Sequence, residues 1–241
     1  MLPRLALAAV ALTIVTGVFG PMVMLSSLVS SGGPAYRIER WWAWLVSKSM
    51  GLSFSLRGAD NVAPGTSYII TPNHQSNSDI LALIRMLPLR FRWVIKRELT
   101  KIPVFGWALS CTGAIAIDRS NPKEAIRILH NATDKLKGNW SVLIYPEGTR
   151  TYDGKLLPFK KGAFMMAVQT GIPILPVTSN GAFKVLPKKT IWFRPGHIIV
   201  TIGNPIPTQG LTENDVPELM ERTRSEINKN LDPDYNPFGK S

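Results

Sequence analysis

The sequence has little of two residue types that often carry chemistry. Its 241 residues include a single cysteine, Cys111, which excludes an intramolecular disulfide framework and a cysteine-ligated zinc site. The three histidines lie far apart, and none belongs to a short metal-binding pattern such as H-E-x-x-H; they are His74, His130 and His197. We therefore expect no metal site and no cofactor.

Acidic side chains are also scarce. The chain has 16 Asp and Glu against 28 Lys and Arg, which gives a formal charge of +12. This excess indicates anionic partners: nucleic acid, an anionic membrane surface, or phosphorylated substrates and carriers. Composition does not choose among them. The length allows one sizeable core, alone or with a membrane segment, and leaves little room for two full domains.

Charge is absent from the amino-terminal region, where no charged side chain occurs between Leu5 and Tyr36. Residues 5–29 are apolar and, at about 1.5 Å per residue, long enough to cross a hydrocarbon layer of about 30 Å. The apolar part of a cleaved signal peptide, the alternative, is normally only about 7 to 15 residues long. We therefore expect a membrane anchor. Pro21 should bend or stop this helix, which leaves open a segment that enters one leaflet and returns.

A second amino-terminal helix is expected after the Gly-Pro turn at 32–34. Its apolar side chains recur at helical spacing and form one face: Ile38, Trp41, Trp42 and Leu45. Arg37, Arg40 and Lys48 could reach lipid headgroups, so we expect an interfacial helix, with an ordinary core-packed helix as the alternative. Residues 1–50 would then form a membrane-associated helix-turn-helix before a domain at 51–241. The denser basic residues after the anchor place that domain on the cytoplasmic side of the cytoplasmic or inner membrane.

From residue 52 onward, short apolar runs alternate with stretches of helical periodicity. The predicted strands are 53–57, 67–71, 91–95, 114–118, 141–145, 174–178 and 198–203, and the predicted helices are 79–86, 122–137, 161–170 and 213–230. This alternation predicts an α/β fold with a mostly parallel or mixed sheet and helices on both faces.

The segment NHQSNSD, residues 73–79, stands where a predicted strand gives way to a helix. His74 would lie at the carboxyl end of that strand, where ligands bind in open α/β sheets. Asp79, in the first helical turn, could accept a hydrogen bond from one ring nitrogen and leave the other free to take a proton. In the alternative interpretation, Asp79 only stabilises the helix dipole and His74 is structural.

Three further strands end in polar or proline-rich turns: GAIAIDR at 113–119, YPEGTR at 145–150 and GIPILPV at 171–177. If these strands are neighbours in one sheet, Arg119 and Arg150 emerge at the same edge as His74. Two guanidinium groups suit a phosphate, because their paired donors match its oxygens and they keep their charge. For each arginine, an ordinary surface ion pair is the alternative.

Taken together, these four segments resemble the sequence blocks of the glycerolipid acyltransferase family, over about residues 40–207. The length and the amino-terminal anchor are similar to its bacterial 1-acyl-sn-glycerol-3-phosphate (lysophosphatidic acid) acyltransferase branch. The Asn-His with Asp after four intervening residues, followed by P-E-G-T-R, is the specific part. Ala116 and Tyr145 depart from the residues that are commoner in the family, which bears on substrate shape.

The resemblance implies transfer of a fatty acyl group from acyl-CoA or acyl carrier protein to the sn-2 hydroxyl of lysophosphatidic acid, which gives phosphatidic acid for phospholipid biosynthesis. His74 would be the general base and Asp79 its orienting partner. The other implied site residues bind the acceptor phosphate, shape the turn that presents it, or contact the carrier: Arg119, Arg150, Glu147, Gly148, Thr149 and Lys96. Ser76 and Ser78 are local nucleophile candidates, but we expect direct transfer. Residues 102–109 could line an acyl tunnel, contact lipid, or form ordinary core.

Other functions remain open at this stage. The acceptor could be glycerol 3-phosphate or another lysolipid. A thioester or ester hydrolase could use the same His and Asp, although the chain lacks a G-x-S-x-G elbow. A non-catalytic protein that binds anionic lipid would leave the ordered polar blocks unexplained. Nucleic acid is a poor fit, because no recognised nucleic-acid-binding motif follows the apolar segment.

Overall fold

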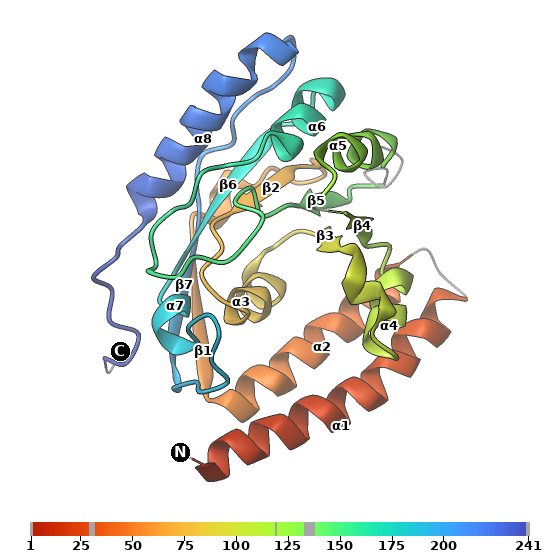
Figure 1. The fold of residues 1–241 in the computed structure, drawn as a ribbon, viewed down its shortest axis with the longest axis vertical. Helices are drawn as coiled ribbons and strands as arrows, with labels where there is room; N and C mark the ends of the chain where they lie inside the picture. Colours follow the sequence, from red (N-terminus) through yellow and green to blue (C-terminus); the bar gives the residue numbers. More distant parts are fainter. Residues whose placement is uncertain (1, 29–31, 119, 133–137, 240–241) are drawn as a thin grey trace.

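The computed structural model describes residues 2–28, 32–118, 120–132 and 138–239. Within them, seven strands form one sheet in the order β1-β7-β6-β2-β5-β3-β4 (Figure 1). Every neighbouring pair is parallel except β6 and β7, which confirms the predicted mostly parallel or mixed sheet. The strands are β1 Leu52–Arg57, β2 Ile69–Pro72, β3 Phe91–Lys96, β4 Ile115–Ile117, β5 Ser141–Leu143, β6 Ile174–Asn180 and β7 Gly196–Ile202.

Helices cover both faces of the sheet, as predicted (Figure 1). The helices are α1 Leu2–Ser27, α2 Gly33–Met50, α3 Ser78–Met86, α4 Phe105–Cys111, α5 Pro122–Asn131, α6 Gly162–Thr170, α7 Ala182–Val185 and α8 Val216–Asn230, with short 3-10 turns η1 Ala59–Asn61, η2 Arg97–Lys101 and η4 Glu213–Asp215. Helix α3 lies on one face with α2 outside it, and α5, α6 and α8 lie on the other. The periodicity did not predict α4 and α7, and the expected end of α5 at 133–137 lies outside the described residues.

Alternating side chains of the central strands supply two separate cores. Ile69 of β2 is in register with Val142 of β5, and both belong to the core under α5, α6 and α8. The next residues along these strands, Ile70 and Leu143, belong to the core shared with α2 and α3. Successive strand residues point to opposite faces, so a strand buried on both sides is a continuous apolar run.

Helix α2 is integrated with the sheet on one side and with α1 on the other. Its Ala43 and Val46 are buried in the core that includes α3 and β7, and Trp42 Nε1 donates to Thr16 Oγ1 of α1 at 3.1 Å. The expectation that Arg40 reaches lipid headgroups is wrong. Its guanidinium donates to carbonyl oxygens at the carboxyl end of α3, namely those of Ile84, Arg85 and Leu87. Helix ends leave such carbonyls without partners, and this buried end takes Arg40 as donor.

Helix α1 runs unbroken from Leu2 to Ser27, so the expectation that Pro21 could stop it is wrong. Contacts with α2 and α4 hold the helix through the proline: a Cβ on Gly20 would lie 2.6 Å from Val104, which leads into α4. By length and composition, Leu5–Ser27 could cross a membrane. Its outward face carries apolar side chains that are roughly half exposed or more, among them Leu7, Val10, Ile14, Val18 and Leu25. This face has the chemistry of a lipid contact.

The exposed face of α1 predicts how the protein is released from membranes. Because apolar area rather than charge would hold the chain there, the full-length protein should stay in the membrane pellet in high salt and dissolve only in detergent. Sedimentation of washed membranes followed by immunoblotting measures this partition. Release of the intact chain by salt alone would show that its basic surface, and not α1, makes the attachment.

Candidate active site

Three polar segments meet at one edge of the sheet because their strands are neighbours. Strands β2, β5 and β3 lie side by side and parallel, so their carboxyl ends point the same way. His74 follows β2, the turn at 145–150 follows β5, and Lys96 ends β3. The sequence-based expectation that the polar ends of these strands gather at one edge is met for the described residues.

Asp79 is the most heavily bonded side chain at this edge. Its Oδ2 lies 3.2 Å from His74 Nδ1 and accepts hydrogen bonds from the backbone N–H groups of Gln75 and Ser76, both at 2.7 Å. Its Oδ1 accepts from Ser179 Oγ at 2.9 Å, so β6 also holds the carboxylate. The group is fully buried in the first turn of α3, where four donors and the helix dipole offset the loss of water.

The His74 ring is held by Tyr145 and Asp79, and its backbone is held by two further hydrogen bonds. Tyr145 stacks on it, with ring centroids 3.6 Å apart and planes 14° from parallel. The His74 backbone N–H donates to Glu147 Oε1 at 2.7 Å, and its carbonyl accepts from the Thr151 N–H at 3.0 Å. With Nδ1 directed at Asp79, Nε2 makes no hydrogen bond to another described residue and is the nitrogen available to a reactant. The stacking of Tyr145 on His74 could not be predicted from the sequence, where Tyr145 is only an aromatic residue after a strand.

Glu147 is buried beneath the loop and does not line the cavity described below. Its two oxygens accept from the backbone N–H groups of His74 and Leu157, at 2.7 and 2.9 Å. Burial raises the pKa of this carboxyl to about 7, because loss of water disfavours the charged form more than the two N–H donors favour it. Gly148 closes the turn: its N–H donates to the Tyr145 carbonyl at 3.0 Å, with φ at +68°, where glycine is unstrained.

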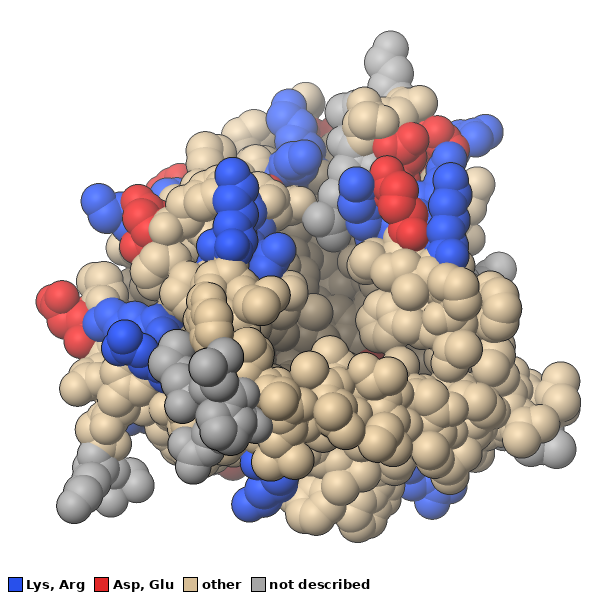
Figure 2. Space-filling view, turned by 60° about the horizontal axis from the view of Figure 1, so that its bottom comes forward, with Lys and Arg blue, Asp and Glu red and all other residues tan. Residues whose placement is uncertain are grey.

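A cavity of about 310 Å³ opens beside His74. Its wall is mostly apolar and comes from α1, α2, α3, β3 and α4, for instance Phe19, Trp42, Ile80, Ile95 and Leu109. Of residues 102–109, Phe105, Ala108 and Leu109 line this cavity, whereas Ile102 and Trp107 are exposed. Figure 2 shows the face that carries α1, with a central hollow and Lys and Arg side chains gathered along its upper rim.

The structure brings some of the predicted phosphate-binding residues together. Lys96 and Arg150 line the same cavity as His74, and Lys96 also forms a half-exposed ion pair with Glu98 at 3.2 Å. Thr149 is exposed, and its hydroxyl accepts a hydrogen bond from Lys188 Nζ at 3.1 Å. Lys188, which sequence reasoning missed, also donates to the Arg150 carbonyl at 2.6 Å. Arg119 lies outside the described residues.

The two candidate nucleophiles of the loop have structural partners. Ser76 Oγ donates to the Leu186 carbonyl at 2.7 Å and accepts from the Ser78 N–H and hydroxyl, at 3.1 and 2.9 Å. Neither hydroxyl is bonded to His74, and neither residue lines the cavity. Cys111 does not line it either. The His74 imidazole is therefore placed to act on a molecule bound in the cavity, and not on Ser76 or Ser78.

Among the described residues, one carboxyl lines the cavity, and it was not foreseen from the sequence. Glu39 of α2 accepts a hydrogen bond from Trp93 Nε1 at 2.8 Å. Burial raises its pKa to about 7, opposed by the Trp93 hydrogen bond. Trp93 stacks on Tyr145, at 6.2 Å between centroids, so Glu39 is linked through two rings to His74. Only the packing of α2 on β3 brings these positions together.

Glu147 should make folding stability depend on pH. Its carboxyl keeps its proton up to about pH 7 in the folded chain but loses it near its ordinary pKa of 4.5 when unfolded, so stability falls as pH rises through this window. The contribution is on the order of 3 kcal/mol. Chemical unfolding at several pH values should show a flatter pH dependence for Glu147→Gln than for the native chain. Glu221→Gln, on the exposed surface of α8, is the matched control, and parallel curves for Glu147→Gln and the native chain would contradict the assignment.

The chain is similar to known proteins of one family. The acyltransferase family profile matches residues 53–180, more than half of the chain. The 1-acyl-sn-glycerol-3-phosphate acyltransferase alpha of Homo sapiens is 38% identical over 175 residues, 72% of this chain and 62% of that protein. The 1-acyl-sn-glycerol-3-phosphate acyltransferase of Pseudomonas aeruginosa is 36% identical over 195 residues, 80% of this chain and 74% of that protein.

A solved structure extends the similarity to nearly the whole chain. The crystal structure of the 1-acyl-sn-glycerophosphate (LPA) acyltransferase, PlsC, from Thermotoga maritima matches with a TM-score of 0.80 and 26% identity, over 95% of this chain and 93% of that one. By contrast, the chain spans about three fifths of the length of the human and yeast relatives. The profile match and the relatives together show that this chain belongs to the acyltransferase family.

Proposed function

We propose that the protein transfers a fatty acyl group from a thioester, acyl-CoA or acyl carrier protein, to the sn-2 hydroxyl of 1-acyl-sn-glycerol 3-phosphate, forming phosphatidic acid. The observation that carries the proposal is the His74–Asp79 pair, which opens into an apolar cavity that Lys96 and Arg150 also line. The names of the bacterial relative and of the solved structure support this acceptor. Neither name specifies the acyl donor.

The chemistry follows from the free ring nitrogen. As the acceptor oxygen attacks the thioester carbonyl carbon, its proton passes to His74 Nε2, and Asp79 stabilises the imidazolium that forms. The carbon–sulfur bond then breaks, and the proton moves from the imidazolium to the leaving thiolate. General base catalysis of this kind supplies on the order of 10² to 10⁴ in rate. No residue of the chain is acylated in this scheme.

The cavity has an apolar wall and two basic side chains, and we match these to the fatty acyl chain and the acceptor phosphate of the substrates. A fatty acyl chain fits the apolar wall from α1, α2 and α4, where burial of each CH₂ contributes about 0.8 kcal/mol. The acceptor phosphate would bind Lys96 and the forked donors of Arg150. We also assign Arg119 and Thr149 to this phosphate, with Glu147 and Gly148 as the residues that shape the turn.

We further propose that residues 1–50 attach the protein to the cytoplasmic membrane and that residues 51–241 carry out catalysis on its cytoplasmic side. The exposed apolar face of α1 supports the attachment. The density of basic residues after α1 supports the sidedness. In this arrangement the cavity, which α1 itself helps to line, can receive lipid without drawing it through water.

An acceptor panel tests the activity. Purified protein in detergent or vesicles is incubated with acyl-CoA or acylated carrier protein and with lysophosphatidic acid, glycerol 3-phosphate or other lysolipids, and the products are identified by mass spectrometry. His74→Ala should lower transfer by at least about 10²-fold, because it removes the proton acceptor. Asp79→Asn should also slow it, because it loses the charge that supports the imidazolium.

Circular dichroism controls for folding in both variants. Free fatty acid as the main product would identify a hydrolase instead, and lipid binding with no product would identify a non-catalytic protein. Unimpaired turnover by His74→Ala would exclude the general-base role while leaving the activity itself in place.

Arg150 provides a separate test of acceptor binding. Arg150→Ala should raise the KM for lysophosphatidic acid and lower kcat, because the phosphate contact both binds the lipid and aims its hydroxyl at His74. Arg150→Lys should rescue only part of the loss, since an ammonium lacks the paired donors of a guanidinium. Arg222→Ala, on the exposed surface of α8, is the matched control.

An acceptor analogue without phosphate completes a double-mutant cycle with Arg150→Ala. If the guanidinium binds the phosphate, the native protein should already be slow with the analogue, and Arg150→Ala should lower that activity only a little further. Simple addition of the two losses would show that Arg150 does not contact the phosphate.

A further inference from the structure

The loop at 187–195, between α7 and β7, exposes an apolar pair. Ile191 is 70% exposed and Trp192 is 44% exposed, and among the described residues after position 28 no other large apolar side chain is as exposed as Ile191. Adjacent exposed Ile and Trp side chains are unfavourable in water unless a second surface covers them. Neither the proposed reaction nor the cavity uses them.

The loop presents this pair from a fixed conformation. Phe193, the next residue, is buried, and the Arg194 N–H donates to the Val185 carbonyl at 2.9 Å. The Trp192 N–H donates to Thr190 Oγ1 at 2.9 Å. At the end of the loop, Pro195 lies against the last turn of α2, where a Cβ on Gly51 would be 3.0 Å away. The exposure is therefore built into the fold.

Basic side chains flank the pair on both sides. Lys188 and Lys189 precede it and Arg194 follows it, and the sequence from 184 to 197 contains no acidic residue. None of the three forms an ion pair with another described residue. The two lysine ammoniums lie over the ring of Tyr152, at 3.8 and 5.3 Å from its centroid. This cluster is complementary to an anionic surface.

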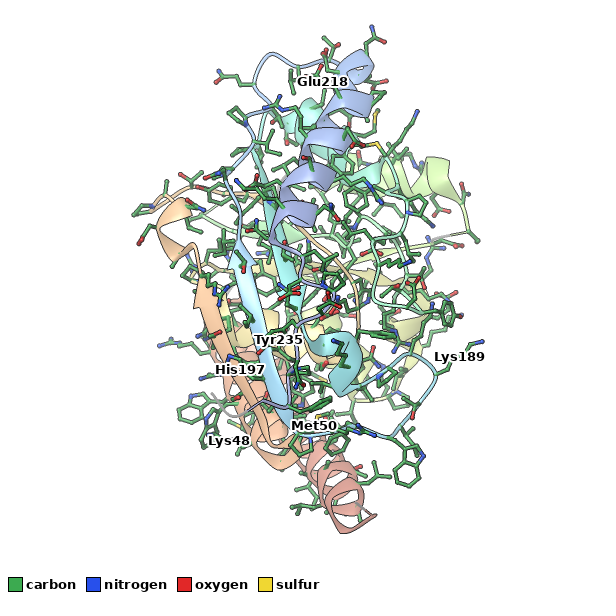
Figure 3. The ribbon with its side chains drawn as sticks, turned by 90° about the vertical axis from the view of Figure 1, so that its left-hand side faces the viewer. Lys48, Met50, Lys189, His197, Glu218 and Tyr235 are labelled. Carbon is green, nitrogen blue, oxygen red and sulfur yellow. The ribbon has the colours of Figure 1, made fainter. Side chains whose placement is uncertain are left out.

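The loop lies at the end of the molecule where the amino-terminal helices meet the sheet. In Figure 1 the connection from α7 to β7 comes close to the carboxyl end of α2, in agreement with the approach of Pro195 to Gly51. In Figure 3 the labelled Lys189 lies higher than Lys48 and Met50 of α2, on the opposite side of the view from Lys48. Lys188 connects the loop to the cavity, since it donates to the carbonyl of Arg150. The loop thus lies beside the carboxyl end of α2 and is bonded to the turn that carries Arg150.

We propose that the loop 187–195 is a second membrane-contact element, which inserts Ile191 and Trp192 at the interface of a leaflet containing anionic phospholipid. Tryptophan beside cations suits this layer, because the ring reaches the acyl boundary while the cations meet phosphates. An acidic protein partner would match the cations but not the apolar pair between them. Contact at α1 and at the loop together would fix the tilt of the domain and hold the cavity against the membrane.

Site-specific fluorescence tests the proposal on the full chain without relying on catalysis. In a Cys111→Ala background, Thr190→Cys carries an environment-sensitive probe, and vesicles of phosphatidylcholine and phosphatidylglycerol contain brominated acyl chains. The probe at 190 should shift to the blue and be quenched several-fold more than a probe at Glu221→Cys on exposed α8. A probe at Val18→Cys on α1 reports attachment of the chain itself.

Further variants and vesicles separate the contributions of the apolar pair and of the basic side chains to membrane contact at the loop. Ile191→Ser with Trp192→Ser should abolish quenching at 190 but not at 18, and Lys189→Gln or vesicles of phosphatidylcholine alone should reduce it. Strong quenching at 18 with none at 190 would overturn the proposal. A shift at 190 caused only by an added acidic carrier protein, and not by vesicles, would overturn it in favour of a protein-docking role.

Discussion

The buried carboxylate of Asp79 is the constraint on which the site depends. It joins three parts of the chain: the loop after β2, the first turn of α3 and, through Ser179, strand β6. Asn73 reinforces the same junction, because its side chain donates to the Ser179 carbonyl and accepts from the Ser179 N–H. A carboxylate without water is tolerable only when such donors are fixed in place, and fixing them also fixes the imidazole.

A second set of contacts holds the His74 loop from the opposite side. Glu147 binds the backbone N–H groups of His74 and Leu157, and Tyr145 stacks on the imidazole. Both residues belong to the turn after β5, so the parallel pairing of β2 with β5 determines where the ring lies. Burial of Glu147 in this arrangement raises the pKa of its carboxyl and costs stability at neutral pH and above. Such costs are common at functional sites, where a fold is not optimised for stability alone.

Helix α1 has two apolar faces with different surroundings. Side chains such as Leu7 and Val18 are exposed, whereas Thr16, Phe19 and Gly20 line the cavity. The close approach of α1 to α4 needs a small residue, because a Cβ on Gly20 would collide with Val104. The helix that appears in the sequence as a separate anchor is therefore also a wall of the site.

Much of this organisation could be predicted from the sequence. Short apolar runs between helical stretches located all seven strands of the described sheet, because a strand that packs against a core favours apolar side chains. The spacing from His74 to Asp79 is local, so strand-to-helix geometry alone brought the two side chains together. The gathering of Lys96, Arg150 and His74 required one further assumption, that their strands are parallel neighbours.

Other features were decided only by tertiary structure. Arg40 binds the end of α3 across more than forty residues, Glu39 meets Trp93 across a similar interval, and Lys188 meets Arg150 from the far side of β6. No periodicity links such positions, because each contact depends on strand order and on how helices pack over the sheet. At Pro21, by contrast, a local prediction was wrong. Proline disfavours a continuous helix, but packing of α1 on α2 and α4 keeps the helix unbroken. The sequence determined the strands, most of the longer helices and the local pairing of His74 with Asp79, while long-range packing decided which side chains surround that pair.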